Sequence, residues 1–408
     1  MLKQCRVCGS KELEPVLDLG VQALTGIFPR RKEDNPESMP LRLVKCNDDG
    51  VHCGLLQLDE TADLSKMYGQ SYGYRSGLNK TMVAHLRGIV EKISKRMVLE
   101  KGDTVLDIGS NDGTLLAAYG EPWPQLIGVD PVGEKFKDYY PPGVQLIGDF
   151  FSAKQFEHYF GNRIKVITSI AMLYDLEDPM QFMREVREVL ADDGMWVFEQ
   201  SYMPAMIGNT SYDTVCHEHL EYYGLTQLQW MMNRTGFKAV DIEFNDSNGG
   251  SLLVFAVKDE LPCVCEENKI AATLEWEMKW GFGKLSPYER FRQQVERSRD
   301  SLNALLDMVR GETILGYGAS TKGNVILQYC DISVEQLPCI AEVNEDKFGA
   351  FTPGTLIPIV AEEEARARKP DYFLVLPWHF RKSIVEREQA FRDAGGTLVF
   401  PLPTLELV

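Results

Sequence analysis

The sequence predicts an α/β protein with two doubly wound sheets and a small cysteine-bearing module before them. Strand-like and helix-like segments alternate from Asp103 onward, and a second alternating block follows a long charged helical region. Such alternation is typical of parallel strands joined by crossover helices. The chain has 408 residues, more than one hydrophobic core usually organises. We therefore expect three domains, at residues 1–75, 76–260 and 261–408.

The N-terminal segment consists of short extended pieces with a cysteine pair at each end of a polar loop. Cys5 and Cys8 have the two-residue spacing that lets both sulfurs reach one tetrahedral metal ion. Cys46 and Cys53 supply a second, wider pair. Four thiolates leave no open position for catalysis, so we predict a structural zinc site. The alternatives are His52 in place of one thiol, or unrelated reduced cysteines.

The middle block begins with a helix predicted from apolar residues at helical spacing over residues 80–99. Five strands follow, and a turn rich in Asn and Gly at 245–250 joins two further strands into a hairpin. Together these elements predict a doubly wound seven-stranded sheet. The expected strands lie at 104–108, 125–130, 144–147, 164–170, 195–199, 238–244 and 251–257, and a crossover helix at 180–190.

A long helical region with few glycines and many charges, residues 266–310, separates the two blocks. The second block alternates again between strands and helices, which predicts a smaller, Rossmann-like α/β domain. Its expected strands lie at 313–317, 339–342, 372–376 and 397–401, with helices at 322–329 and 379–394.

The net charge of the chain is −17, which disfavours sequence-independent binding to nucleic acid, because such binding requires clustered lysines and arginines. No stretch is long and apolar enough to span a bilayer, and the first residues do not begin a signal peptide. We expect a cytoplasmic protein with no membrane or nucleic-acid partner. The sequence favours neither a monomer nor a homodimer.

The turn after the first strand of the middle block carries the features of a nucleotide site. Asp107 ends the strand, and Gly109, Ser110 and Asn111 form the turn, which precedes an expected helix. In a doubly wound sheet this position is the topological switch point, where backbone N–H groups approach a ligand. The spacing from Gly109 to Gly113 differs from the G-x-G-x-x-G fingerprint, so a nicotinamide cofactor is disfavoured.

Two further strand ends carry matching residues. Asp130 follows one βα unit later, where a carboxylate can accept both hydroxyls of a ribose. After the third strand, Asp149 is placed to accept from an adenine amine and Phe150 to stack on the ring. Each aspartate alone can be a helix N-cap, but acids at three successive strand ends favour a cofactor site.

These residues resemble the cofactor motifs of class I S-adenosylmethionine methyltransferases. The resemblance implies the doubly wound seven-stranded sheet of that class, with S-adenosylmethionine as the cofactor. It places Asp107 and Gly109 in the methionine pocket and Asp130 on the ribose. Asp149 and Phe150 then meet the adenine.

The segment 211–223 follows the fifth strand and is expected near the methyl group to be transferred. It contains His217 and His219, two of the six histidines of the chain. A neutral imidazole is a suitable general base near pH 7, and the adjacent Glu218 can orient it and raise its basicity. The alternatives are a histidine and a glutamate that satisfy buried backbone groups, or a catalytic metal held by the His-Glu-His run.

A second glycine turn, Gly316-x-Gly318, follows the first strand of the C-terminal block and precedes a helix. Ser320 and Lys322 stand at the start of that helix, where a diphosphate group is favoured, and Asn324 follows them. A purely structural tight turn is the main alternative. The missing third glycine of the fingerprint disfavours nicotinamide binding here too.

The cysteine pairs, the nucleotide turn, the His-Glu-His run and the run Gly316-Tyr-Gly-Ala-Ser-Thr-Lys-Gly-Asn324 together resemble the sugar C-methyltransferase family. That family joins a zinc-binding module, a methyltransferase domain and a C-terminal Rossmann-like domain, and it methylates ring carbons of nucleotide-linked keto-deoxysugars. The resemblance implies that the base is His219, assisted by Glu218. It also implies that aromatic residues of the N-terminal segment line the sugar site, here Tyr72 and Tyr74.

The C-terminal domain is expected to contribute to binding of the sugar nucleotide. The expected substrate contacts are His217, Tyr222, Ser320, Lys322 and Asn324. The sequence departs from the family at Cys216, where a tyrosine is common, and within residues 173–178, where a histidine is common.

The expected reaction needs a carbon next to a ketone, because only a carbonyl makes that C–H bond acidic enough for a side-chain base. His219 removes the proton, and the enolate carbon attacks the sulfonium methyl in line while hydrogen-bond donors stabilise the oxyanion. A small-molecule O- or N-methyltransferase would use the same motifs. A zinc-bearing binding protein that only holds the cofactor is the alternative without catalysis.

Overall fold

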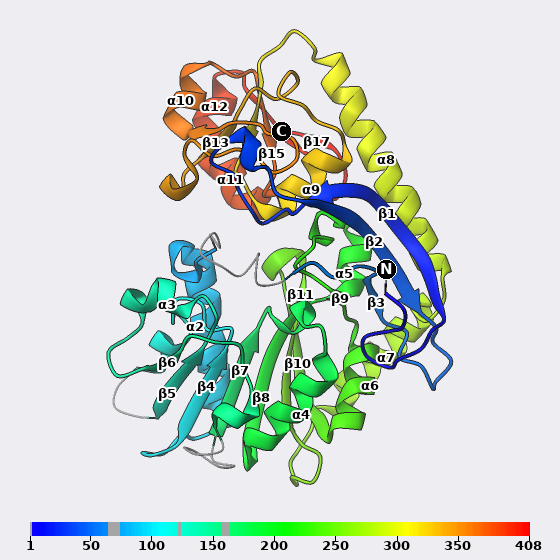
Figure 1. Cartoon of the computed structure of the whole chain (residues 1–408), viewed down its shortest axis with the longest axis vertical. Helices are drawn as coiled ribbons and strands as arrows, with labels where there is room; N and C mark the ends of the chain where they lie inside the picture. The colour runs from blue at the N-terminus through cyan, green and yellow to red at the C-terminus, as the bar shows by residue number, and fades with distance from the viewer. Residues whose placement is uncertain (1, 64–73, 121–123, 157–163) are drawn as a thin grey trace.

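The structure, a computed structural model, contains three β-sheets in the residues that it describes, which are 2–63, 74–120, 124–156 and 164–408. In Figure 1 the seven-stranded and the six-stranded sheet lie toward opposite ends of the molecule. Strands β1 (Leu13–Ala23) and β2 (Ser38–Cys46) and the long helix α8 (Ser286–Met308) run along one side between these ends (Figure 1). Within the described ranges, no helix combines the length and the apolar character that crossing a membrane requires.

The seven-stranded sheet has the strand order β10-β11-β8-β7-β4-β5-β6. Its strands are parallel from β8 to β6, whereas β11 runs antiparallel to both of its neighbours, β8 and β10. This is the class I methyltransferase fold that the sequence predicts. The strands are β4 (Thr104–Ile108), β5 (Gln125–Val129), β6 (Gln145–Ile147), β7 (Ile164–Ile170), β8 (Leu190–Ser201), β10 (Phe237–Asn245) and β11 (Ser251–Lys258).

Strand β4 lies in the middle of this sheet, between β5 and β7, and all five of its residues are buried. The strand order reverses here, so the turn that follows β4 lies at the switch point. The helix expected after this turn is shorter than predicted. Only the 3-10 turn η3 (Leu116–Tyr119) forms, because Gly113 and Gly120 on its two sides have φ of +74° and +65°, values that a helix does not contain.

The helices of this domain follow from their caps and apolar faces. The Asn79 side chain accepts hydrogen bonds from the N–H groups of Thr81 and Met82 and so begins α2 (Lys80–Arg96). This helix buries Leu86, Ile89, Val90 and Ile93, the spacing that the sequence predicts. The other long helices of the domain are α4 (Pro179–Val189) and α6 (Leu225–Thr235).

The C-terminal sheet has the order β14-β13-β12-β15-β16-β17, and its strands are parallel except β17. It confirms the predicted second α/β domain. The sequence missed β14 and β17, because strands of three and two residues are too short to show a pattern. The elements are β12 (Ile314–Tyr317), α9 (Thr321–Tyr329), β13 (Ile340–Glu342), β14 (Ile359–Ala361), α10 (Glu362–Ala367), β15 (Tyr372–Val375), α11 (Arg381–Arg387), α12 (Gln389–Asp393), β16 (Thr397–Phe400) and β17 (Glu406–Leu407).

The long helical region between the two blocks is two helices, α7 (Glu267–Trp280) and α8. Gly281 ends α7 in the left-handed conformation, with φ of +80°, the usual C-terminal cap. Side chains of α8 such as Phe291 share one hydrophobic core with Leu43 of β2 and with the C-terminal sheet. The N-terminal module and the C-terminal domain are therefore packed together through α8.

The four-stranded sheet contains a strand from a distant part of the chain. Its order is β1-β2-β3-β9, and all neighbours are antiparallel. Strand β3 (Leu56–Leu58) belongs to the N-terminal module, whereas β9 (Glu221–Tyr222) follows the His-Glu-His run of the middle block. The segment that carries the candidate base is thus built into the N-terminal sheet.

Candidate active site and zinc site

The four cysteines of the N-terminal module converge on one point. Their Sγ atoms all lie within 4.8 Å of one another, with 3.5 Å from Cys5 to Cys53 and 3.4 Å from Cys8 to Cys46. A tetrahedral ion with Zn–S bonds of about 2.3 Å separates its ligands by about 3.8 Å. The thiolate set therefore fits zinc. The cluster is complete without His52, whose Nδ1 lies 2.9 Å from a carboxylate oxygen of Asp49.

The turns around the cysteines explain this convergence. Gly9 follows Cys8 with φ of +72° and donates its N–H to the Cys5 carbonyl at 2.9 Å, which closes a tight knuckle. Gly54 follows the last cysteine with φ of +66° and donates to the Asn47 carbonyl at 2.9 Å. That bond closes the intervening loop into a turn, so the wider spacing of the second pair still delivers both sulfurs.

The switch-point turn holds buried polar groups in fixed positions. Asp107 is 3% exposed and accepts a hydrogen bond of 2.6 Å from the Thr168 hydroxyl. Burial raises the pKa of Asp107 to about 7. Gly109 has φ of +76°, so the chain reverses where a side chain is disfavoured. The Ser110 hydroxyl lies 2.7 Å from the phenolic oxygen of Tyr140.

Asp130 is anchored to the same turn. One carboxylate oxygen accepts the Asn111 N–H at 2.8 Å, and the other accepts the Val132 N–H at 2.8 Å. Burial raises the pKa of Asp130, and these two N–H groups oppose that shift. The two bonds fix the plane of the carboxylate, and each oxygen keeps a further lone pair for a hydroxyl group. The predicted cofactor residues Asn111 and Asp130 are thus brought together.

The residues predicted for adenine lie on the rim of the site. Asp149 and Phe150 are exposed, and the Phe150 ring has half of its surface open to solvent. A carboxylate oxygen of Asp149 accepts the N–H of Phe150 at 2.8 Å. The neighbouring Phe151 instead packs against other rings, with centroids 5.5 Å apart for its contact with Phe182. An exposed ring at the end of β6 is available to stack on a base.

Sequence reasoning missed several polar residues of the cofactor side. The Tyr140 hydroxyl donates to the Asn111 carbonyl at 2.9 Å and so braces the turn. Glu199, near the end of β8, is buried, lies 2.8 Å from His85 Nε2 and accepts from the Asn245 amide at 2.7 Å. These contacts join segments far apart in the chain, so no local pattern indicates them.

His219 is held as a neutral ring. Its Nδ1 lies 2.8 Å from the Thr214 carbonyl oxygen, so this nitrogen carries the proton. Burial first, and the nearby Lys322 second, lower the pKa of His219 to about 4. Among the hydrogen bonds of the described residues, none reaches Nε2, whose lone pair is available as a base.

The other two members of the His-Glu-His run face different partners. His217 Nε2 lies 3.4 Å from the Met39 carbonyl, and burial lowers the pKa of this histidine to about 4. Glu218 is buried, accepts from the Thr25 hydroxyl at 3.3 Å, and has its pKa raised by burial. Thr214, rather than the predicted Glu218, therefore orients the His219 ring.

The two departures from the family pattern lie beside these residues. Cys216 is buried, and burial raises the pKa of its thiol well above the usual range, so it is a neutral group. The Tyr174 ring meets the His219 ring edge-on with centroids 4.5 Å apart. Tyr174 thus packs on the candidate base.

Two of the three tyrosines predicted for the substrate site have described partners within the protein. Tyr222 is buried and donates to the Thr214 carbonyl at 3.4 Å. Tyr74 is half exposed, and its carbonyl accepts from the Asn111 amide at 3.2 Å. Tyr72 lies outside the described residues.

The start of α9 brings the C-terminal domain to the catalytic segment. Lys322 donates a hydrogen bond to the Asn248 carbonyl at 3.0 Å. Burial lowers the pKa of this lysine, and the nearby Asp213 opposes that shift. Trp378 donates its indole N–H to Asp213 at 2.8 Å. Ser320 caps the helix through the Gly323 N–H at 3.0 Å. Asn324 donates to the Thr25 carbonyl at 2.7 Å, so residues from all three domains meet here.

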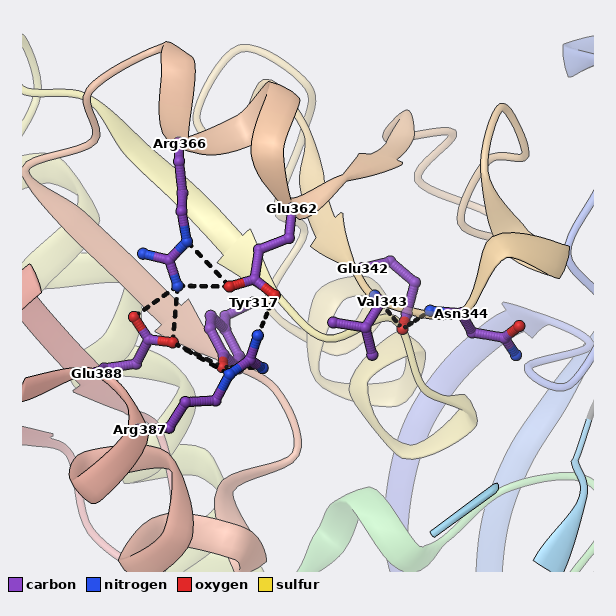
Figure 2. A network of polar contacts seen from close by, with 8 residues as sticks. All are labelled: Tyr317, Glu342, Val343, Asn344, Glu362, Arg366, Arg387 and Glu388. Atoms are coloured by element: carbon purple, nitrogen blue, oxygen red, sulfur yellow. Dashed lines mark hydrogen bonds and ion pairs between the residues drawn. The ribbon is translucent and has the colours of Figure 1, made fainter. Parts of the chain in front are cut away.

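The glycine turn of the C-terminal domain is braced in the same way as the switch-point turn. Figure 2 shows Glu342 at the end of β13; one of its oxygens accepts the Ala319 N–H at 2.8 Å. In the same view, Tyr317 donates to Glu388 at 3.0 Å, and Arg366 contacts Glu388 at 2.7 Å. Asp130 and Glu342 therefore play equivalent structural roles in the two α/β domains.

Three family models together match most of the chain. Residues 5–68 match a domain described as zinc-binding, residues 79–242 match the model "Methyltransferase domain", and residues 246–403 match the model "C-methyltransferase C-terminal domain". The chain is also 29% identical to the C-methyltransferase NovU of Streptomyces niveus, over 98% of this chain and 96% of that protein.

Among solved structures, two relatives are similar to part of the chain. The YcgJ protein of Bacillus subtilis is 18% identical, with a TM-score of 0.35 over 44% of this chain and 100% of that one. The PH0226 protein of Pyrococcus horikoshii OT3 is 14% identical, with a TM-score of 0.37 over 49% of this chain and 100% of that one.

Proposed function

We propose that the chain, an S-adenosylmethionine-dependent methyltransferase similar to C-methyltransferases, methylates a sugar carbon next to a ketone. The substrate we propose is a nucleotide-linked keto-deoxysugar. The observation that carries the proposal is the state of His219, whose Nδ1 is tied to a backbone carbonyl while Nε2 keeps its lone pair. Such a ring can accept a proton from carbon.

His219 is expected to become more basic when the enolate forms beside it. Burial disfavours the imidazolium, which keeps the ring neutral before the substrate binds. Removal of a proton next to a ketone creates an enolate, and its negative charge favours the imidazolium that forms beside it. When bound, S-adenosylmethionine supplies an electrophilic methyl group for the enolate carbon. An O- or N-methyltransferase has no need to generate a carbanion.

The C-terminal domain is proposed to hold the nucleotide. Ser320, Lys322 and Asn324 lie at the beginning of α9, next to the catalytic segment. A diphosphate would replace the Asn248 carbonyl as the acceptor from Lys322. We assign residues 1–75 to zinc, 76–260 to the methyl donor and 261–408 to the nucleotide, with Tyr72 and Tyr74 beside the sugar. The cluster of reduced thiolates suits a cytoplasmic location.

Hydrogen exchange into the substrate tests the reaction type. In D₂O with S-adenosylhomocysteine and a keto-sugar nucleotide, we expect deuterium at the carbon next to the ketone, because the base works before methyl transfer. His219→Ala should abolish both this exchange and turnover, since the substitution removes the base. Affinity for S-adenosylhomocysteine should persist, because the described contacts of the His219 ring are with Thr214 and Tyr174 and not with the cofactor residues.

Three outcomes would contradict the proposal. Turnover of the His219→Ala variant at the wild-type rate would refute the base. A product methylated on oxygen or nitrogen would identify the other enzyme class. Failure of every keto-sugar nucleotide to yield S-adenosylhomocysteine would indicate a binding protein that only holds the cofactor.

A further inference from the structure

The backbone that follows the candidate base is held from two sides. The Leu220 N–H donates to the Tyr174 carbonyl at 2.7 Å, and the Leu220 carbonyl accepts the Leu58 N–H at 2.9 Å. Strand β9 then pairs with β3 through Tyr222 opposite Leu56. The position of the neighbouring His219 therefore depends on β3, a strand of the zinc-binding module.

Strand β3 is attached to the second cysteine pair. It begins three residues after Cys53, along the chain itself. The Cys46 N–H donates to the Leu55 carbonyl at 2.8 Å, and the preceding Lys45 pairs with Leu56. A metal ion that fixes these two thiolates thus fixes the start of β3.

The first cysteine pair is connected to β3 by hydrogen bonds of Arg6, which lies between Cys5 and Cys8. The Arg6 N–H donates to the Gln57 side chain at 3.1 Å, and the guanidinium donates to the Leu58 carbonyl at 2.6 Å. The same guanidinium reaches the Thr61 hydroxyl at 2.7 Å. Arg6 therefore holds the middle and the C-terminal end of β3.

Arg6 also reaches β9 directly. Its Nε lies 3.8 Å from a carboxylate oxygen of Glu221, two residues after His219, and the side chains of Arg6 and Glu221 are 3% and 0% exposed. Burial raises the pKa of Glu221 well above its usual range, and the nearby Arg6 opposes that shift. The contact of these two buried side chains therefore joins the knuckle to β9. The described contacts of Asp107 and Asp130 do not involve either residue.

We propose that the zinc knuckle is the positioning element for the base, and that Arg6 and Glu221 are positioning residues that set His219 through β3 and β9. This inference rests on the proposed role of His219 as the base. The zinc knuckle then serves catalysis, whereas S-adenosylmethionine binding does not depend on Arg6 or Glu221. Loss of the contacts that Arg6 makes with β3 and Glu221 should therefore reduce turnover and leave cofactor affinity unchanged.

The test uses Arg6→Ala and Glu221→Gln in the full chain, with zinc content, calorimetric affinity for S-adenosylhomocysteine, turnover and amide hydrogen exchange as readouts. For both variants we expect zinc to stay bound and cofactor affinity to stay at the wild-type value. Amides of residues 219–223 should exchange faster, since the bonds that protect them are weakened. Turnover should fall by about 100-fold, the usual effect of misplacing a reacting group by about 1 Å.

Arg42→Ala is the matched control. It removes an arginine on β2 of the same sheet, whose Nε lies 3.0 Å from Asp59, without touching β9. Exchange of residues 219–223 and turnover should stay near wild type in this variant. An equal loss in Arg42→Ala would show a general weakening of the module and would overturn the proposal.

Further outcomes decide the proposal. Wild-type exchange and turnover in zinc-loaded Arg6→Ala would refute the proposal. If Arg6→Ala loses zinc, the exchange and turnover of Glu221→Gln decide the question alone, because Glu221 lies outside the knuckle. Removal of zinc from the wild-type protein by a chelator should raise exchange of residues 219–223 while S-adenosylhomocysteine still binds. If His219→Ala keeps its turnover, the proposed function fails, whereas the exchange data still show whether the knuckle holds β9.

Discussion

Lys322 sets part of the proton affinity of the candidate base, and its removal should move the pH profile. Burial and Lys322 together take the pKa of His219 from 6.5 to about 4, with burial the larger cause. Lys322→Met keeps the length and the apolar stem of the side chain and removes the charge. The pKa of His219 should therefore rise, because a neighbouring cation no longer opposes protonation.

The size of the shift follows from the order of the two causes. Since burial is the larger one and remains, we expect a rise of about one unit, equivalent to about 1.4 kcal/mol. The neutral ring is the active form, so activity falls as the pH drops through the pKa of His219. At pH 5 about nine-tenths of the wild-type ring is neutral, and about half in the variant. The acid limb of the profile should thus move to higher pH.

The assay is kcat/KM between pH 4 and 8, together with titration of the ring by NMR. Lys347→Met is the matched control: this half-buried lysine of the same domain donates to the Ala319 carbonyl at 2.7 Å and is not among the groups that shift the pKa of His219. An acid limb that stays in place or moves to lower pH in Lys322→Met would refute the electrostatic argument. An equal shift in Lys347→Met would refute it as well.

Two more substitutions test the packing around the base and the cofactor turn. A Cβ atom on Gly26 would lie 2.0 Å from Glu218 Oε1, so Gly26→Ala should lower the free energy of unfolding by about 1–3 kcal/mol in urea titrations. Gly88→Ala, in open space within α2, should instead raise it by about 1 kcal/mol, and equal effects of the two would contradict the steric argument. Asp130→Ala removes the carboxylate that we propose for the ribose, and calorimetry should show S-adenosylmethionine affinity lowered by about 10- to 100-fold, a loss of about 1.5–3 kcal/mol. Unchanged affinity would remove Asp130 from the cofactor site.

Much of the fold could be predicted because the relevant signals are local. The buried strands β4 and β7 are short apolar runs between turn residues, and α2 shows its apolar stripe with an Asn cap. The knuckle spacing from Cys5 to Cys8 likewise follows from the reach of two sulfurs around one ion. After β4 the sequence predicted a helix, but only the 3-10 turn η3 forms. The left-handed conformations of Gly113 and Gly120, which limit this turn, do not follow from a pattern of apolar residues.

The site could be predicted only in part from local sequence patterns. The sequence predicts acids at the strand ends, and Asp107 and Asp130 do meet at the switch-point turn. It also placed Glu218 as the partner of His219, whereas the Thr214 carbonyl takes that role. A backbone carbonyl leaves no mark in a sequence, since every residue has one.

The sequence by itself determined the main strands of the two α/β sheets, the thiolate set and the candidate base, because each follows from local patterns in the chain. Only the tertiary structure decided that the strand after His219 pairs with β3, that Arg6 meets Glu221, and that Lys322 lies beside the base. These contacts join segments separated by more than 100 residues, and β9 has only two. Pairing over such distances is fixed by the packing of whole domains, which local patterns do not encode.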